Sequence, residues 1–484
     1  MNASVTETLH EQLTQKQINL VVIGCTILGI SIGALGLSLG TIQGPILRSV
    51  GGESYFSMVT TISSLAMCLM TPIGGRLIDM WGSRKVILYS NILITVSILI
   101  MAVSHNLWIF IITRFLMSLG LGAEASAPFI LLREVSDVKN LPKLMGYLGA
   151  GTALGSFLGS YLAGLFTDMN MLWLAIIFPL VFVVIAVPLI DKNLPKIKPD
   201  TSIKMDYVGI ILLAVAFGGI FMSLNFGPTI GWGDWKILAG FAIGIVGLIL
   251  LWKTQNGPSA LIPKTIFANK AYSMILLIAF FSVFYQTALN VYVPAGVQDL
   301  MHASNAASGS LQIPRTILSV VLPTFCGIWL AKNQTKNTWV SMAITGACIL
   351  LSFSLLVFMG KNMPLWFVIV MVSFTGIADA FRGVTLTPAA QAELKPSDMG
   401  IGTSMLGFVI TLSNLISSAI YGIAFDTLKN ANPGAVGETA GLDTVFLLAA
   451  ISGLICLILA VTVYRKMVIR NAAKKAAAAA EANN

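Results

Sequence analysis

The sequence predicts an all-α protein that crosses a membrane about fourteen times, and three observations support this. First, about fourteen stretches of roughly 20 mostly apolar residues follow one another, each long enough to cross a ~30 Å hydrocarbon core as a helix. Second, apolar residues make up 56% of the chain and charged residues 10%, against about 45–50% and 25% in soluble domains. Third, the basic residues gather in alternate connections between the stretches.

The first six spans are separated by short connections. They are predicted at about 19–39, 55–78, 86–104, 107–128, 144–166 and 172–190. A polar segment with one basic residue precedes the first span, and it shows no small-residue cleavage site. We therefore expect the first span to be retained and not removed as a signal peptide.

The remaining eight spans divide into a pair and a second set of six. They are predicted at about 207–226 and 236–252, then at about 271–293, 309–331, 339–359, 364–386, 401–422 and 444–464. Short motifs of the first six spans recur in the last six, displaced by about 251 to 256 residues, as expected for parallel repeats related by an axis along the membrane normal.

This repeat predicts the domain organisation. We expect two six-helix bundles with two additional helices between them and a tail at the end. Their boundaries are placed at about 1–192 for the first bundle, 193–270 for the linker with the extra helices, 271–466 for the second bundle and 467–484 for the cytoplasmic tail.

The positive charge predicts an orientation. With the N-terminus in the cytoplasm, roughly 22 of the 29 Lys and Arg fall on the inner side and about 4 on the outer side. An even number of spans then returns the C-terminus to the cytoplasm. The net charge of +9 is thus explained by headgroup anchors, and no nucleic-acid partner is expected. The five cysteines and three histidines form no metal-ligand pattern, so neither a metal nor a cofactor is expected.

The clearest motif lies at the inner end of the second span, where residues 75–85 read GRLIDMWGSRK. Gly75 allows a neighbouring helix to approach closely. Asp79 can accept charge-assisted hydrogen bonds from basic side chains or from a helix N-terminus. Gly82 permits a tight reversal, and Arg84 and Lys85 are expected at the cytoplasmic headgroups. The alternative interpretation is a simple charged reverse turn, which would use the same residue types.

This segment resembles the inner loop between spans two and three of the major facilitator superfamily, which reads G-x-L-x-D-x-x-G-x-R-K. The resemblance implies a transporter with the two-bundle major facilitator fold. It also implies that Gly75, Asp79, Gly82, Arg84 and Lys85 act together as a gating motif.

Span five carries a glycine stripe at Gly151, Gly155 and Gly159, spaced one helical turn apart. It is similar to the antiporter motif of the superfamily, G-x-x-x-G-P-x-x-G-G, with Ser156 at the proline and Ser160 at the last glycine. The similarity implies export by antiport, whereas close helix packing would require the same glycines.

The two extra spans resemble the fourteen-span drug:proton antiporters of the superfamily. The resemblance rests on DYVG at residues 206–209, GW at 231–232 and LIP at 261–263. One departure concerns the end of span one, where Leu39 occupies the place of the aspartate in the motif L-D-x-T-I-V-N. Proton or cation handling at that position is therefore not implied.

Two carboxyl groups lie deep within predicted spans, Glu124 in span four and Asp379 in span twelve. An intramembrane carboxyl suggests a proton-exchanging site. Arg382 follows Asp379 by three residues and shares its helix face, which predicts an ion pair. Glu124 lacks such a local partner and is therefore our first candidate for the coupling proton, ahead of Asp379.

Arg114, in span four, is the third candidate for proton coupling. Its surroundings are similar to the span-four motif of the superfamily, R-x-x-Q-G-x-G, with Met117 and Ser118 replacing Gln and the first Gly. This resemblance is what implies proton transfer or coupling at Arg114. An arginine in hydrocarbon costs at least ~2.5–3.5 kcal/mol, so it should face the bundle interior or water. A structural role in holding a neighbouring helix is the alternative.

Substrate contacts are expected mainly from span nine, where the amides Gln286 and Asn290 lie one turn apart, with Tyr292 close by. The amides could instead form interhelical hydrogen bonds. Arg315 and Arg382 are further candidate contacts, although Arg315 is expected mainly to extend towards the outer interface. The membrane arginines outnumber the membrane carboxyls by one, which leaves anionic, zwitterionic and amphipathic substrates open.

We therefore expect a proton-coupled exporter of amphipathic drugs or related small molecules that works by alternating access. It is expected to act as a monomer in the bacterial cytoplasmic membrane, with protons, a small-molecule substrate and lipid as partners. An uptake or uniport carrier for an anionic or zwitterionic solute, a lipid or glycolipid translocase, and a membrane sensor remain alternatives. The sequence contains no phosphate-binding loop or nucleophile elbow, so an enzyme is not expected.

Overall fold

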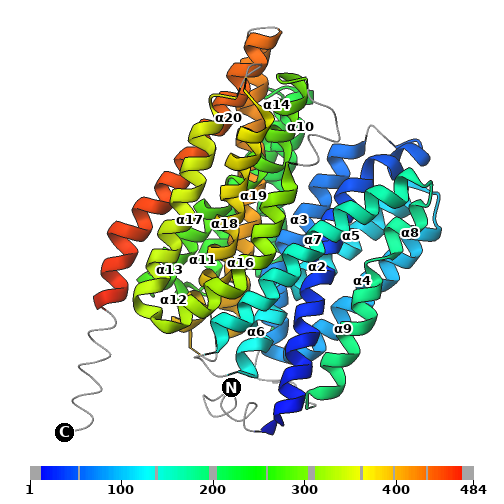
Figure 1. Ribbon diagram of the computed structural model, residues 1–484. Coiled ribbons are helices and arrows are strands. Elements are labelled where there is room, and N and C mark those ends of the chain that lie inside the picture. Colours follow the sequence, from blue (N-terminus) through cyan, green and yellow to red (C-terminus); the bar gives the residue numbers. More distant parts are fainter. Residues whose placement is uncertain are drawn as a thin grey trace. The chain divides into compact units, whose positions relative to one another are not determined.

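The computed structural model describes residues 12–52, 55–136, 140–195, 204–257, 260–302, 311–359, 363–395, 398–431 and 434–470. Across these ranges the regular elements are all helices (Figure 1). Fourteen helical segments among the described residues are long and apolar enough to cross a membrane. This confirms the predicted all-α architecture. Most of the predicted tail, from residue 471 onwards, lies outside the described residues.

The chain divides into two compact units. Unit 1 comprises Met1–Phe267 and Leu394–Thr411, and unit 2 comprises Ala268–Glu393 and Leu412–Asn484. Helix α19 (Met399–Ala431) therefore begins in unit 1 and ends in unit 2. The limits of the predicted bundles remain a prediction.

Unit 1 contains eleven complete helices within its described residues. They are α2 (Gln15–Ser49), α3 (Phe56–Trp81), α4 (Ser83–Val103), α5 (Leu107–Glu124), α6 (Ala127–Glu134), α7 (Leu141–Asp168), α8 (Leu172–Ile177), α9 (Leu180–Asn193), α10 (Tyr207–Ile230), α11 (Trp235–Thr254) and α12 (Lys264–Phe267).

The ends of these helices follow local chemistry. Helix α2 begins with a capping box in which Thr14 and Gln17 satisfy each other's backbone N–H groups. Two predicted spans of unit 1 each consist of two helices, α5 and α6 in the fourth span and α8 and α9 in the sixth. Pro128 lies in the first turn of α6, and Pro179 directly precedes α9, and proline is tolerated at such starts because the N–H that it lacks would be unpaired there.

The glycine stripe of α7 packs on α2, and the two helices lie side by side (Figure 1). A Cβ atom at Gly151 would lie 2.6 Å from the carbonyl oxygen of Thr26, and one at Gly159 would lie 2.5 Å from that of Ala34. No real side chain tolerates such distances from backbone. The stripe therefore brings the two helices into backbone contact.

The extra helices α10 and α11 form a hairpin within unit 1, and α10 packs against α3. The Asn225 side chain donates a hydrogen bond to Thr61 Oγ1 over 2.6 Å. Phe217 packs edge-on against Phe408 at the start of α19, with ring centroids 5.4 Å apart.

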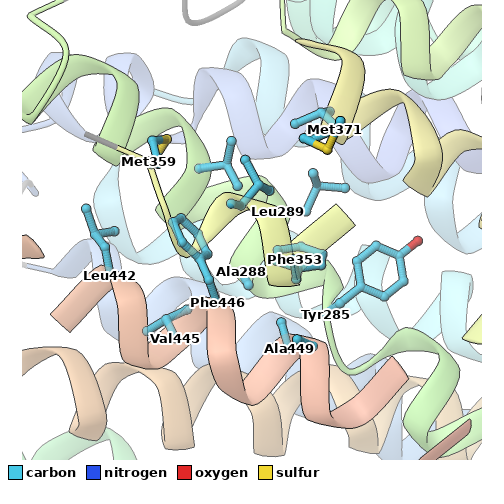
Figure 2. Packing of buried hydrophobic residues seen from close by; sticks show 14 of the residues in the cluster. Tyr285, Ala288, Leu289, Phe353, Met359, Met371, Leu442, Val445, Phe446 and Ala449 are labelled. Atoms are coloured by element: carbon cyan, nitrogen blue, oxygen red, sulfur yellow. The ribbon is translucent and has the colours of Figure 1, made fainter. Parts of the chain in front are cut away.

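Unit 2 is built around a dense apolar core. Its helices are α13 (Lys270–Val283), the π-helix η2 (Ala288–Tyr292), α14 (Val293–Asp299), α16 (Gln312–Lys332), α17 (Gln334–Leu356), α18 (Leu365–Ala392), the end of α19, α20 (Ala435–Ile458) and the π-helix η4 (Leu459–Tyr464). Figure 2 shows the ring of Phe353 in this core between Tyr285 and Phe446. Phe353 packs at centroid distances of 5.7 Å from Tyr285 and 6.1 Å from Phe446. The core thus places Tyr285 at its edge, next to the charged groups described below.

Candidate functional site

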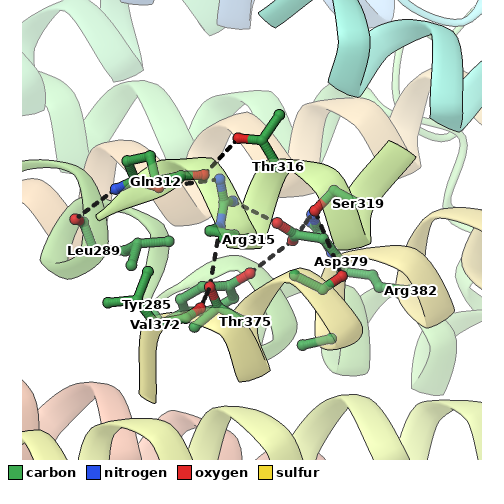
Figure 3. A network of polar contacts seen from close by, with 12 residues as sticks. Tyr285, Leu289, Gln312, Arg315, Thr316, Ser319, Val372, Thr375, Asp379 and Arg382 are labelled. Carbon is green, nitrogen blue, oxygen red and sulfur yellow. Dashed lines mark hydrogen bonds and ion pairs between the residues drawn. The ribbon is translucent and has the colours of Figure 1, made fainter. Parts of the chain in front are cut away.

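A cluster of charged side chains lies inside unit 2 (Figure 3). Helix α16 supplies Arg315, and α18 supplies Asp379 and Arg382. The Asp379 carboxylate lies 2.5 Å from Arg315 Nη2 and 2.6 Å from Arg382 Nη2. Tyr285, between α13 and η2, donates its hydroxyl hydrogen to Asp379 Oδ1 over 2.6 Å. We call these four residues the arginine cluster.

Further contacts fix the guanidinium group of Arg315. Its Nε donates to Thr375 Oγ1 over 3.0 Å, and its Nη1 donates to Gln312 Oε1 over 3.4 Å. Thr375 in turn donates to the carbonyl of Val372 over 2.6 Å. Each of these contacts is drawn in Figure 3. Arg315 therefore uses all three of its nitrogen atoms.

The cluster carries one more positive than negative charge. Two guanidinium groups share a single carboxylate, and all three charged side chains are largely buried, with 13–17% of their surface exposed. The Nε atom of Arg382 is buried and has no hydrogen-bond partner among the described residues. A buried charge without full compensation costs several kcal/mol, so this surplus requires an explanation.

The cluster confirms one expectation and corrects another. The predicted ion pair between Asp379 and Arg382 is present. The expectation that Arg315 extends to the outer interface was wrong, because its side chain turns to Asp379 on another helix. Pairing with a carboxylate stabilises a membrane arginine without any need to reach the headgroups.

Glu124 lies in a different environment, within unit 1. It is at the end of α5, only 1% exposed, and it accepts a hydrogen bond from the amide of Asn91 on α4. The same amide nitrogen also donates to the carbonyl of Ile87 over 2.9 Å. No ion pair to Glu124 is found among the described residues. Its identified partner is therefore neutral, in contrast to those of Asp379.

Arg114 lies on the same helix as Glu124 without pairing with it. Its Nε is buried and finds no hydrogen-bond partner in the described part of the chain. Among the described residues, no ion pair joins the Arg114 side chain to a neighbouring helix. Its predicted role in proton coupling remains a prediction.

The three span-nine residues expected to contact substrate, Gln286, Asn290 and Tyr292, follow Tyr285 closely in the sequence. None of them shares its contact with Asp379. Gln286 is half-buried and Asn290 exposed, and the structure gives neither amide a hydrogen bond to any residue it describes. Tyr292 instead packs its ring against Tyr421 and Phe425 at centroid distances of 6.3 Å and 5.3 Å. The substrate contacts expected of these residues remain predictions.

The gating motif is organised around Asp79. Its two carboxylate oxygens accept the N–H groups of Gly400, over 2.9 Å, and of Ile401, over 3.1 Å, in the first turn of α19. Gly82 adopts a φ of +83° between α3 and α4, a conformation that favours glycine. The structure therefore provides the helix N-terminus as a partner of Asp79, where a negative charge is stabilising.

The basic end of the motif is anchored too. Arg84 Nε lies 2.8 Å from Asp191 Oδ1 on α9. A Cβ atom at Gly75 would lie 2.5 Å from Ser404 Cβ, so the glycine permits α19 to approach α3. These contacts all fall within unit 1.

Sequence reasoning assigned no site role to Tyr285 or Asn91, which contact the two buried carboxyl groups. A signal existed for Asn91, because a buried amide in an apolar span requires a partner. Tyr285 gave a weaker signal, because a tyrosine in an apolar span can pack its ring in the core and needs only one hydrogen-bond partner for its hydroxyl, which the sequence does not identify.

Fourteen helical segments of membrane-crossing length in the described part of the chain, together with buried and paired charges, are features of a polytopic membrane transporter. A family profile for the Major Facilitator Superfamily matches residues 20–418. The chain belongs to this superfamily, as its loop motif predicted. It is therefore a multi-pass membrane protein that transports small molecules, not an enzyme.

Curated relatives support this classification at low identity. The chain is 25% identical over 406 residues to multidrug transporter protein MdtP of Bacillus subtilis, covering 82% of this chain and 73% of that protein. It is 24% identical over 412 residues to multidrug resistance protein 3 of the same organism, covering 84% of this chain and 80% of the relative.

Solved structures share the fold. The human organic anion transporter MFSD10 superposes with a TM-score of 0.62 at 14% identity, covering 92% of this chain and 98% of the other. An auto-inhibited POT family peptide transporter gives a TM-score of 0.60 at 15% identity, covering 92% and 96%. At these identities the similarity concerns the fold alone.

Proposed function

We propose that this protein exports amphipathic small molecules in exchange for protons, by alternating access, in the bacterial cytoplasmic membrane. The observation that carries the proposal is the carboxyl group of Glu124, fully buried beside a neutral amide. The names of the curated relatives, multidrug transporter and multidrug resistance protein, support the export of varied molecules.

Glu124 suits the coupling role because a negative charge on its carboxyl group would be poorly compensated. An ionised carboxylate at this place would be a buried charge that, among the described residues, has only the Asn91 amide to stabilise it, which costs several kcal/mol. Water or a cationic group must reach the site before the proton leaves. Loss of the proton is thereby linked to a change in access, which is the requirement for coupling.

Asp379 is less suited to this role. Two guanidinium groups and the Tyr285 hydroxyl hold its ionised form, so a proton would have to displace strong, charge-assisted contacts. We assign Glu124 as the first proton site, with Asp379 and Arg114 as secondary candidates.

The test is transport by the purified protein in proteoliposomes under an imposed pH gradient, with rhodamine dyes as cargo. Glu124→Gln keeps the size and hydrogen bonding of the side chain but cannot ionise. We expect it to retain exchange of dye across the membrane and to lose proton-driven accumulation by about 5- to 150-fold, the range of typical coupling energies.

The control is Glu438→Gln, which removes a carboxylate paired with Lys429 on the partly exposed end of unit 2. This variant should accumulate dye like the unmodified protein. Full coupling in Glu124→Gln would exclude Glu124 as the proton site. Absence of any proton-driven dye movement in the unmodified protein would contradict the export proposal as a whole.

A further inference from the structure

We propose that the arginine cluster of unit 2 is an anion-binding subsite, which recognises a carboxylate, sulfonate or phosphate group on the transported molecule. This inference rests on the proposed function and specifies its substrate class. It is carried by the contacts within the cluster (Figure 3).

The carboxylate of the cluster is already occupied. Asp379 Oδ2 accepts from Arg315, and Oδ1 accepts from both Arg382 and Tyr285. A cationic substrate would have to displace two guanidinium groups that are held on packed helices. Asp379 is therefore a poor receptor for a cation.

The donors of the cluster are not all occupied. An arginine side chain offers five N–H groups, yet Arg382 contributes to the cluster through Nη2, and its buried Nε has no hydrogen-bond partner in the described residues. Because Nε itself is buried while 15% of the side chain is exposed, a small shift of the Arg382 side chain would bring this N–H to an entering anionic group and satisfy a donor that is otherwise costly to bury. The anionic group would form a charge-assisted contact of the kind that guanidinium groups favour.

The charge of the cluster favours the same ligand. Two guanidinium groups and one carboxylate sum to one positive charge, and no second carboxylate among the described residues pairs with either arginine. One bound anion would bring this buried site to neutrality. The side chains of Arg315 and Arg382 keep 17% and 15% of their surface exposed, so they are not sealed in the core.

The experiment compares a rhodamine dye that carries a free carboxylate with the methyl ester of the same dye. Both share the cationic ring system, so they differ in the anionic group alone. With the full-length protein in proteoliposomes under a pH gradient, we expect the carboxylate dye to be transported at least about tenfold better than the ester, as the usual strength of a hydrogen bond to a charged group implies.

Variants assign the preference to the cluster. Arg382→Gln should reduce the carboxylate-to-ester ratio to about one, and Arg382→Lys, which keeps the charge but loses Nε, should give an intermediate ratio. The control is Arg465→Gln, because Arg465 stacks over the ring of Trp339, 4.9 Å from the ring centroid, and takes part in none of the cluster's contacts described above. It should leave the ratio unchanged. A merely structural arginine would lower the transport of both dyes equally, which would overturn the proposal.

Binding measurements separate this inference from the proposed function. Fluorescence anisotropy of the two dyes with the detergent-solubilised protein reports binding without transport. Selective binding of the carboxylate dye, lost in Arg382→Gln, would support the subsite even if no dye were pumped, in which case the export proposal alone would fail. Equal binding of acid and ester would reject the subsite, whatever the transport assay shows.

Discussion

At the scale of single residues, the two intramembrane carboxyl groups differ in what surrounds them. Asp379 meets two guanidinium groups and a hydroxyl, whereas Glu124 meets the amide of Asn91. Ionised partners favour a permanent charge, and neutral partners favour a group that gains and loses its proton. This contrast underlies the division of roles that we propose, with proton coupling at Glu124 and anion recognition at the arginine cluster.

The hydroxyl of Tyr285 provides a test of the arginine cluster. We expect Tyr285→Phe to destabilise the protein by about 1.5–3 kcal/mol, because it removes a buried hydrogen bond to a charged group. Thermal unfolding in detergent measures the effect.

Tyr421→Phe is the matched control for this prediction. Tyr421 is equally buried, but its hydroxyl donates to a neutral carbonyl, that of Phe284, over 3.0 Å. Its loss should cost about 0.5–1.5 kcal/mol. A smaller effect at Tyr285 than at Tyr421 would show that Asp379 is not ionised in the cluster.

At the scale of the helices, small residues decide which elements come together. The stripe on α7 meets the backbone of α2, and Gly75 on α3 meets α19. Helices in membranes associate through van der Waals contact and hydrogen bonds, because lipid is as apolar as the helix surface. Glycine therefore determines how closely two helices can approach. Polar contacts, such as the hydrogen bonds from the first turn of α19 to Asp79, fix which parts of the two helices meet.

The glycine stripe predicts the outcome of a single added methyl group. Gly159→Ala should destabilise the protein by about 1–3 kcal/mol, since the methyl group would press on the backbone of α2 at Ala34. Gly164→Ala, on the same helix, is the control, because no atom lies within 4 Å of its Cβ position. That change should be neutral or slightly stabilising in a helix. Equal melting temperatures for the two variants would refute the close packing of α7 on α2.

At the scale of the whole molecule, the positive charge predicts which side of the membrane each connection occupies. The basic residues of the inner connections would lie at the cytoplasmic headgroups, with both chain ends on that side. The proposed proton site, Glu124, belongs to unit 1, and the proposed anion site, the arginine cluster, belongs to unit 2. Coupling therefore requires that protonation of Glu124 and substrate binding at the cluster affect each other.

Cysteine labelling tests the predicted orientation. Gly233 lies between α10 and α11, Lys192 lies near the end of α9, and both are exposed. Each is replaced by cysteine in a protein from which the five native cysteines have been removed. We expect a membrane-impermeant maleimide to label Gly233→Cys in intact cells and Lys192→Cys only after permeabilisation. The reverse pattern would invert the topology.

The sequence alone determined the class, the fourteen apolar spans and the family, because these depend on local properties. A helix satisfies its backbone hydrogen bonds within one segment, so a long apolar run is sufficient to predict a span. The pair of Asp379 and Arg382 was also predictable, since three residues of separation place both on one helix face.

Tertiary structure decided which buried polar groups meet. Arg315 reaches Asp379 across 64 residues, Asn91 reaches Glu124 across 33, and Asp79 reaches the start of α19 across 321. Helical periodicity cannot predict contacts between residues so far apart in the sequence, because these contacts depend on how the helices pack. Burial then makes each contact strong, since a charge or amide without a partner is costly away from water.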